Sequence, residues 1–191
     1  MREADWQELR FYGPLESHAD SFIANKLPEI AGIYVWCVRS PDGIYRVHYV
    51  GEAANLRSRC RQHWRDQLAG KYDAFLPTAL RNNLKVLVHR ARIGVVPRYQ
   101  DELSAEQANR QYLGCISVFY AAVPEHASRS ARCQFETAIA HAVEDWGQNI
   151  LHVGKLNRRL THSQVYRVTS GGNLIEGLTE QRVEVFLPEA T

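Results

Sequence analysis

Apolar residues change their spacing along the chain, and each spacing predicts a different kind of element. Residues Gly32 to Val38 form a nearly continuous apolar run rich in Ile, Tyr, Val and Trp, which is typical of a buried strand. Residues Ser40 to Gly43 (Ser-Pro-Asp-Gly) have the composition of a tight turn. Residues Ile44 to Val50 then alternate, so the two runs predict a β-hairpin. The alternation predicts one face made of Tyr45, Val47 and Tyr49 and an opposite face made of Arg46 and His48.

A four-residue apolar spacing follows the hairpin and predicts a helix that runs to about Leu68. Asn55 is a suitable N-cap for this helix, and Gly70 is a suitable stop. Its apolar stripe consists of Leu56, Cys60 and Trp64. A second long helix is predicted from Ser130 to Trp146, with Gly147 at its end. Its core positions are Phe135, Ile139, Ala142 and Trp146.

Shorter predicted elements complete the fold. The pattern indicates helices over residues 21–27 and 104–112, and strands over residues 84–93, 115–123, 164–168 and 182–187. No internal repeat or low-complexity segment interrupts them. Together these elements predict an α/β (α+β) protein, with a small, mainly antiparallel central sheet flanked by helices. A length of 191 residues fits a single domain over residues 1–191.

Composition narrows the class of protein only a little. Hydrophobic residues make up 45% and charged residues 23%, which is ordinary for a globular protein, and the net charge of +2 does not by itself indicate a nucleic-acid binder. No apolar run approaches the roughly 20 residues needed to span a bilayer, so we expect no membrane partner. The four cysteines lie far apart without a Cys-x-x-Cys pair, which argues against a zinc module and favours reduced thiols in a cytoplasmic protein. They are Cys37, Cys60, Cys115 and Cys133.

Four residues of the hairpin and the first helix suggest phosphodiester chemistry. Neighbouring strands lie about 4.8 Å apart, so the hairpin can bring Tyr34 and Tyr49 together. A tyrosine has a pKa of about 10, so a nearby cation must lower it before the phenol can accept a proton at neutral pH. Arg59 can supply that cation and can also bind phosphate oxygens. His63 lies one helical turn later on the same flank and could relay a proton.

The ordered set of motifs resembles the GIY-YIG nuclease family, whose members cut DNA phosphodiesters with one divalent metal ion. Gly32-Ile33-Tyr34 and Tyr49-Val50-Gly51 match the two motifs that give the family its name. Measured from Gly51, Arg59 stands where the excision-repair members carry their catalytic arginine, and His63 where several restriction endonucleases carry a histidine. The resemblance implies that Tyr34 is the general base and that Tyr49 assists it.

The resemblance also implies a metal site on the second long helix. Glu136 matches the glutamate that holds the family's metal, and Asn149 matches an asparagine that braces the site. A lone carboxylate suits Mg²⁺ or Mn²⁺. The expected partner is double-stranded DNA. The resemblance covers residues 31–63 and 115–149, so the expected organisation is a core of 31–66 and 115–150, an insertion of about 67–114 and a C-terminal extension of 151–191.

Two departures keep other functions open. Glu52 stands where many family members carry a lysine, although Arg46 or His48 could compensate for the lost positive charge. The long insertion is where target-specific contacts are expected, and it favours a restriction-type enzyme. The basic residues of the insertion could bind successive phosphates of a nucleic acid, or they could form an ordinary solvated surface. The alternatives are a non-catalytic nucleic-acid-binding module with the same fold, and a nuclease that acts on RNA.

Overall fold

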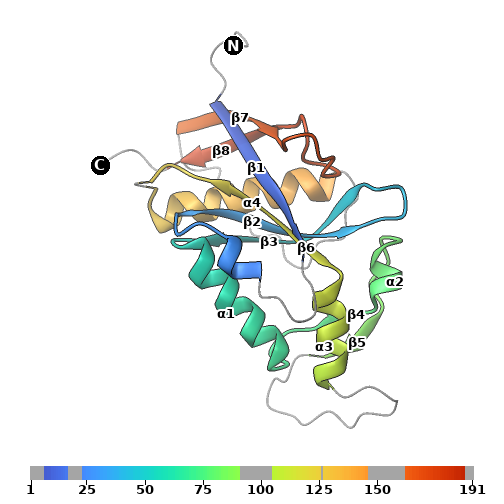
Figure 1. Ribbon diagram of the computed structural model, residues 1–191. Helices are drawn as coiled ribbons and strands as arrows, with labels where there is room; N and C mark the ends of the chain where they lie inside the picture. The colour runs from blue at the N-terminus through green and yellow to red at the C-terminus, as the bar shows by residue number, and fades with distance from the viewer. Residues whose placement is uncertain (1–6, 17–22, 91–104, 126, 146–161, 188–191) are drawn as a thin grey trace.

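A six-stranded sheet forms the centre of the molecule, with helices on both of its faces (Figure 1). The computed structural model describes residues 7–16, 23–90, 105–125, 127–145 and 162–187. All neighbouring strands pair antiparallel except β1 and β7, which are parallel, so the prediction of a mainly antiparallel sheet is confirmed. The spatial order is β3 (Tyr45–Ala53), β2 (Gly32–Arg39), β6 (Ile116–Ala122), β1 (Gln7–Glu16), β7 (His162–Thr169) and β8 (Arg182–Leu187).

Three helices cover the two faces of the sheet. Helix α4 (Arg129–Asp145) lies on one face, where Phe135 and Ile139 join Ile33 and Val35 in a buried cluster. Helices α1 (Leu56–Leu68) and α3 (Ala105–Gly114) lie on the opposite face, as Figure 1 shows. There the alternate residues of β2 and the inner sides of both helices form a second buried cluster. Each face of β2 is therefore buried, which accounts for its continuous apolar sequence.

The predicted start and end of α1 agree with the structure. The Asn55 side chain accepts a hydrogen bond from the Ser58 backbone N–H at 2.9 Å, so Asn55 is the N-cap. The helix ends at Leu68, and Gly70 follows with a φ of +70°, a conformation that favours glycine. His63 and Gln67 are buried together with Leu56 and Cys60, so the inner face of α1 is wider and more polar than its apolar stripe indicates.

A β-bulge in the hairpin changes one prediction. Trp36 pairs with Tyr49, but the next residue, Cys37, pairs with Val47, so His48 is the extra residue of β3. The bulge puts His48 and Tyr49 on the same face, toward α1 and α3, whereas Val47 faces α4. The prediction that His48 and Tyr49 point to opposite faces, with Tyr49 beside Val47, is therefore wrong.

The inserted segment contributes a small separate sheet that packs against α3. Strand β4 (Ala74–Phe75) pairs with β5 (Leu87–His89), and the segment that connects them contains the short helix α2 (Pro77–Leu80) (Figure 1). The strand predicted over 84–93 is thus only three residues long in the described part, and residues 91–93 lie outside it. The helix predicted over 21–27 is a 3-10 helix, η2 (Ile23–Lys26).

A segment near the C-terminus is hydrogen-bonded to the start of β3, the second strand of the hairpin. Tyr45 donates a backbone hydrogen bond to Leu174 O at 3.0 Å, and its carbonyl accepts one from Glu176 N at 2.9 Å. These bonds form a parallel bridge between Tyr45 and Ile175, at the outer side of edge strand β3. Ile175 is fully buried, so this segment belongs to the same core as the hairpin. The two strands predicted after residue 162 are confirmed as β7 and β8.

Candidate functional site

The two glycine–tyrosine motifs fit together side by side in the hairpin. Tyr34 is fully buried and lies opposite Gly51 on β3. A Cβ atom at position 51 would lie 2.5 Å from Cζ and 2.7 Å from the hydroxyl oxygen of Tyr34, so only glycine leaves room for this ring. The rings of Tyr34 and Tyr49 have their centroids 5.9 Å apart. Because Gly51 has no side chain, the Tyr34 ring fits beside β3 and the two phenols lie close together.

Helix α1 places His63 against both phenols. Nδ1 of His63 lies 3.3 Å from the Tyr34 hydroxyl, within hydrogen-bond distance, and its ring stacks on Trp36 at 4.1 Å. The Tyr49 ring packs edge-on against His63 with centroids 4.9 Å apart. Burial, and then the Arg59 charge, lower the pKa of His63 to about 4. His63 is therefore neutral at neutral pH, and its imidazolium form would need a nearby negative charge to be stable.

Arg59 lies one turn before His63 and interacts electrostatically with both phenols. Its charge lowers the pKa of Tyr34, in the direction expected from the sequence. Burial and the neighbouring Tyr49 act more strongly, however, and raise the pKa of Tyr34 well above its usual value. The prediction that Arg59 makes Tyr34 a base at neutral pH is thus not met by the protein without substrate, because desolvation outweighs the cation.

Glu136 reaches the same place from the other side of the sheet. Helix α4 packs on the face opposite α1, but β3 is an edge strand, so groups from both faces can meet at its end. Glu136 interacts electrostatically with Tyr49, Glu52 and Arg59. Burial, and then the Glu52 charge, raise the pKa of Glu136 to about 7, against the smaller opposing effect of Arg59. Protonation of Glu136 is therefore shifted toward the neutral pH range.

Glu52 has its own cationic partner, which the sequence analysis missed. Nε of Arg132 on α4 lies 2.8 Å from Oε2 of Glu52, and both side chains are largely buried. Arg132 precedes Glu136 by one helical turn, so the acid and the ion pair are neighbours on α4. Glu52, the residue that departs from the expected lysine, is therefore one half of a largely buried ion pair.

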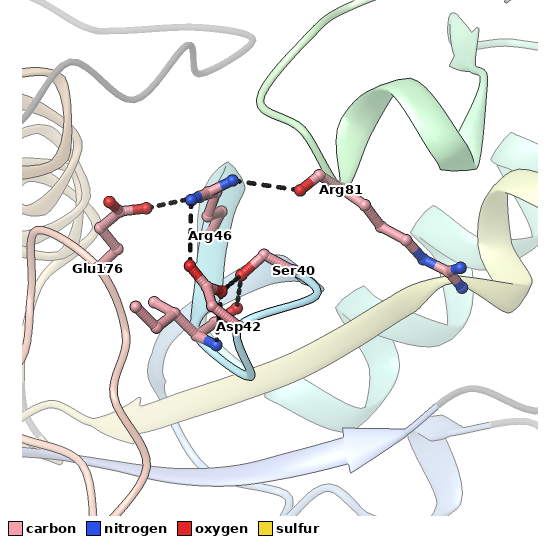
Figure 2. Close-up of polar contacts among 6 residues, drawn as sticks. Ser40, Asp42, Arg46, Arg81 and Glu176 are labelled. Carbon is pink, nitrogen blue, oxygen red and sulfur yellow. Dashed lines mark hydrogen bonds and ion pairs between the residues drawn. The ribbon is translucent and has the colours of Figure 1, made fainter.

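Neither residue that was expected to compensate for this lysine faces the site. Figure 2 shows Arg46 between the Glu176 carboxylate, at 2.8 Å, and the backbone carbonyl of Arg81, at 3.2 Å. Asp42 lies 3.6 Å from the same guanidinium. His48 is buried, with Nε2 2.7 Å from the Tyr112 hydroxyl. The expectation that Arg46 or His48 compensates for Glu52 is therefore wrong.

Tyr72 is a further site residue that the sequence analysis missed. Its ring packs edge-on against His63 with centroids 4.8 Å apart, and its phenol interacts electrostatically with Arg59 and Tyr49. Tyr72 follows the turn at Gly70, near the start of the insertion, and no sequence motif identifies Tyr72. Asn149, the remaining predicted site residue, lies outside the described residues.

The arrangement brings together a neutral imidazole, three phenols, a guanidinium and a carboxyl group with a raised pKa at one end of β3. Within the described ranges, no group of three or more His, Cys, Asp or Glu residues is arranged to hold a metal ion, and no helix is long and apolar enough to cross a membrane. Comparisons with protein-family models, with curated proteins and with solved structures find no match to this chain.

Proposed function

We propose that this chain is a divalent-metal-dependent endonuclease of the GIY-YIG kind, which hydrolyses phosphodiester bonds of double-stranded DNA. The observation that carries the proposal is the electrostatic interaction of Glu136 from α4 with Arg59 and with Tyr49, whose ring packs against His63. The two sets of groups come from helices on opposite faces of the sheet. Ionisable side chains that interact in a partly buried place without forming a simple ion pair are more typical of a reaction site than of a structural contact.

Glu136 suits a hard divalent cation. Its carboxyl group is costly to ionise because it is partly buried and is repelled by the charge of Glu52, and a bound cation would offset both effects. Glu136 would hold Mg²⁺ or Mn²⁺, and the ion's other positions would be left to water and phosphate oxygens. When bound, the metal would polarise the phosphate and stabilise the leaving oxygen.

The other residues have distinct proposed roles. Arg59 binds the non-bridging oxygens of the scissile phosphate and stabilises the charge that grows on them in the transition state. Tyr49 is only partly buried, so its hydroxyl is the phenol that meets the attacking water. The Tyr34 hydroxyl lies between Tyr49 and Nδ1 of His63 and passes the proton on to the imidazole. Phosphate charge near His63 favours the imidazolium form that results.

The experiment that tests the proposal uses two glutamates of the same helix. Purified protein is incubated with plasmid DNA and Mg²⁺ or Mn²⁺, and nicked and linear products are quantified. Glu136→Gln and Arg59→Ala should abolish cleavage and leave DNA binding largely intact. Glu144→Gln is the matched control, because Glu144 is exposed on α4, and it should cleave like the parent protein. Unchanged cleavage by Glu136→Gln would refute the assignment.

A second candidate function is nucleic-acid binding without turnover. The Glu52–Arg132 pair favours it, because it removes a free cation from beside the phosphate position. In that case the parent protein would bind DNA and cleave neither DNA nor RNA with either metal. Cleavage of RNA but not of DNA would instead assign the same site to RNA.

A further inference from the structure

Exposed aliphatic side chains gather on the part of the insertion that we call the insertion tip (residues 76–90). Leu84 is 60% exposed and Val86 47% exposed, and Leu76 and Leu87 are also exposed. A backbone hydrogen bond from Leu76 N to Val86 O, at 2.8 Å, joins the two sides of the tip. These four residues are more than half of the exposed large hydrophobic residues in the described ranges. A single exposed leucine is ordinary, but a cluster on one small element indicates a contact surface.

The charge of the insertion tip has one sign. Its basic residues are Arg81, Lys85 and Arg90, and the sequence contains no Asp or Glu between residues 74 and 90. Arg81 and Arg90 are exposed, and Figure 2 shows the Arg81 side chain directed away from the Arg46 cluster while its carbonyl is bound there. A surface that combines cations with aliphatic side chains is complementary to a polyanion that also has apolar parts.

The insertion tip begins next to the candidate site. Tyr72, four residues before the tip, packs against His63 with ring centroids 4.8 Å apart. Leu76 follows Tyr72 by four residues, which is at most about 14 Å of extended chain. Nucleotides in a duplex rise by about 3.4 Å each, so Leu76, the first residue of the insertion tip, lies within about four base-pair steps of Tyr72.

We propose that the insertion tip is a DNA-contact surface that enters a groove of a double-stranded substrate. Leu84 and Val86 pack against sugars and bases, and Arg81 and Arg90 bind the flanking phosphates. Aliphatic wedges of this kind are used in grooves of duplexes, whereas single strands are bound by stacking on aromatic rings, and residues 76–90 contain no Phe, Tyr or Trp. This inference rests on the proposed function, since it names how the same site would hold its substrate.

The test measures binding in the Glu136→Gln background, by fluorescence anisotropy with a labelled duplex and with the matching single strand. Leu84→Ser/Val86→Ser should weaken duplex binding about tenfold or more and change single-strand binding little. Leu174→Ser is the matched control, because Leu174 is 51% exposed on another part of the molecule, and it should bind like its parent. Arg81→Ala/Arg90→Ala should make the salt dependence of log K shallower by about 2, and Arg182→Ala should not.

The outcomes separate this inference from the proposed function. If the unmodified protein cleaves duplex DNA and the insertion-tip variants bind duplex DNA as tightly as Leu174→Ser, the inference is overturned and the proposed function stands. If the unmodified protein neither binds nor cleaves nucleic acid, the inference and the proposed function are both refuted. If light scattering shows that Leu84→Ser/Val86→Ser only converts a dimer into a monomer of unchanged DNA affinity, the patch is a self-association surface and the inference is overturned.

Discussion

Replacing Gly51 by alanine tests the close fit between the two motifs of the hairpin. The added methyl group would lie 2.5 Å from Cζ and 2.8 Å from Cε1 of Tyr34, well inside van der Waals contact. Tyr34 is fully buried between β2, α1 and the rings of Tyr49 and His63, so it has little room to move. We therefore expect Gly51→Ala to push the Tyr34 ring out of position.

The size of the effect follows from overpacking a close-packed core. Such a clash typically costs about 1–3 kcal/mol, and for a protein of this length each kcal/mol lowers Tm by roughly 2–4 °C. Urea denaturation and a thermal melt should both report this loss. If the proposed function holds, the cleavage rate should fall further than stability implies, because a shift of about 1 Å in a reacting group can cost about 100-fold.

Two further variants make the test specific. Gly114→Ala is the control, because a Cβ there meets nothing within 4 Å, and it should be neutral or stabilising by up to about 1 kcal/mol. In a Tyr34→Leu background, Gly51→Ala should cost clearly less than in the parent protein, since the ring that it strikes is gone. A Gly51→Ala variant as stable as the Gly114→Ala variant would refute the reasoning.

Three other predictions concern stability. Arg46→Ala should lower the free energy of unfolding by about 1 kcal/mol in urea denaturation, because it leaves the part-buried Glu176 carboxylate without its ion pair. Arg167→Ala removes an exposed ion pair and should lower it by less than about 0.5 kcal/mol. Equal losses in the two variants would contradict this prediction. The pKa of Glu136 is raised from 4.5 to about 7, so the folded state binds the proton more tightly and stability should fall as pH rises from about 4.5 to 7. Glu136→Gln should lose this part of the pH dependence, and an unchanged profile would count against it. Excess Mg²⁺ or Mn²⁺ at pH 8 should raise Tm of the parent protein but not of Glu136→Gln, and an equal rise in both would exclude Glu136 as the ligand.

Local sequence signals were sufficient for the hairpin and the two long helices. The apolar run of β2, the Ser-Pro-Asp-Gly turn and the Asn55 cap each specify structure through nearby residues, and the structure has the corresponding elements close to their predicted bounds. The proximity of Tyr34 and Tyr49 follows from the same hairpin. Their catalytic roles, and that of Glu136, stay predictions.

Features that depend on distant contacts were not predictable in this way. Strand β1 was missed because only Leu9 and Phe11 are fully buried along Gln7–Glu16, a weak alternation that is completed by pairing with β6 and β7. The position of a bulge is likewise set by the partner strand, so strict alternation assigned His48 to the wrong face.

The electrostatics of the site were also beyond the reach of sequence alone. The pKa of Tyr34 depends on how completely α1 and its neighbours exclude water, which a spacing of residues does not report. Tyr72 and Arg132 come to the site from the insertion and from α4, far from the hairpin motifs in sequence, and no motif marks either residue.

The bridge between Tyr45 and Ile175 has a consequence for how the molecule avoids unwanted association. An edge strand with free N–H and C=O groups can recruit a strand from another molecule and seed aggregates. Here the chain's own Leu174–Glu176 segment occupies those groups at the first residue of β3. Loss of these backbone hydrogen bonds would expose the start of β3. Variants that weaken the bonds should therefore precipitate more readily than their loss of stability alone explains.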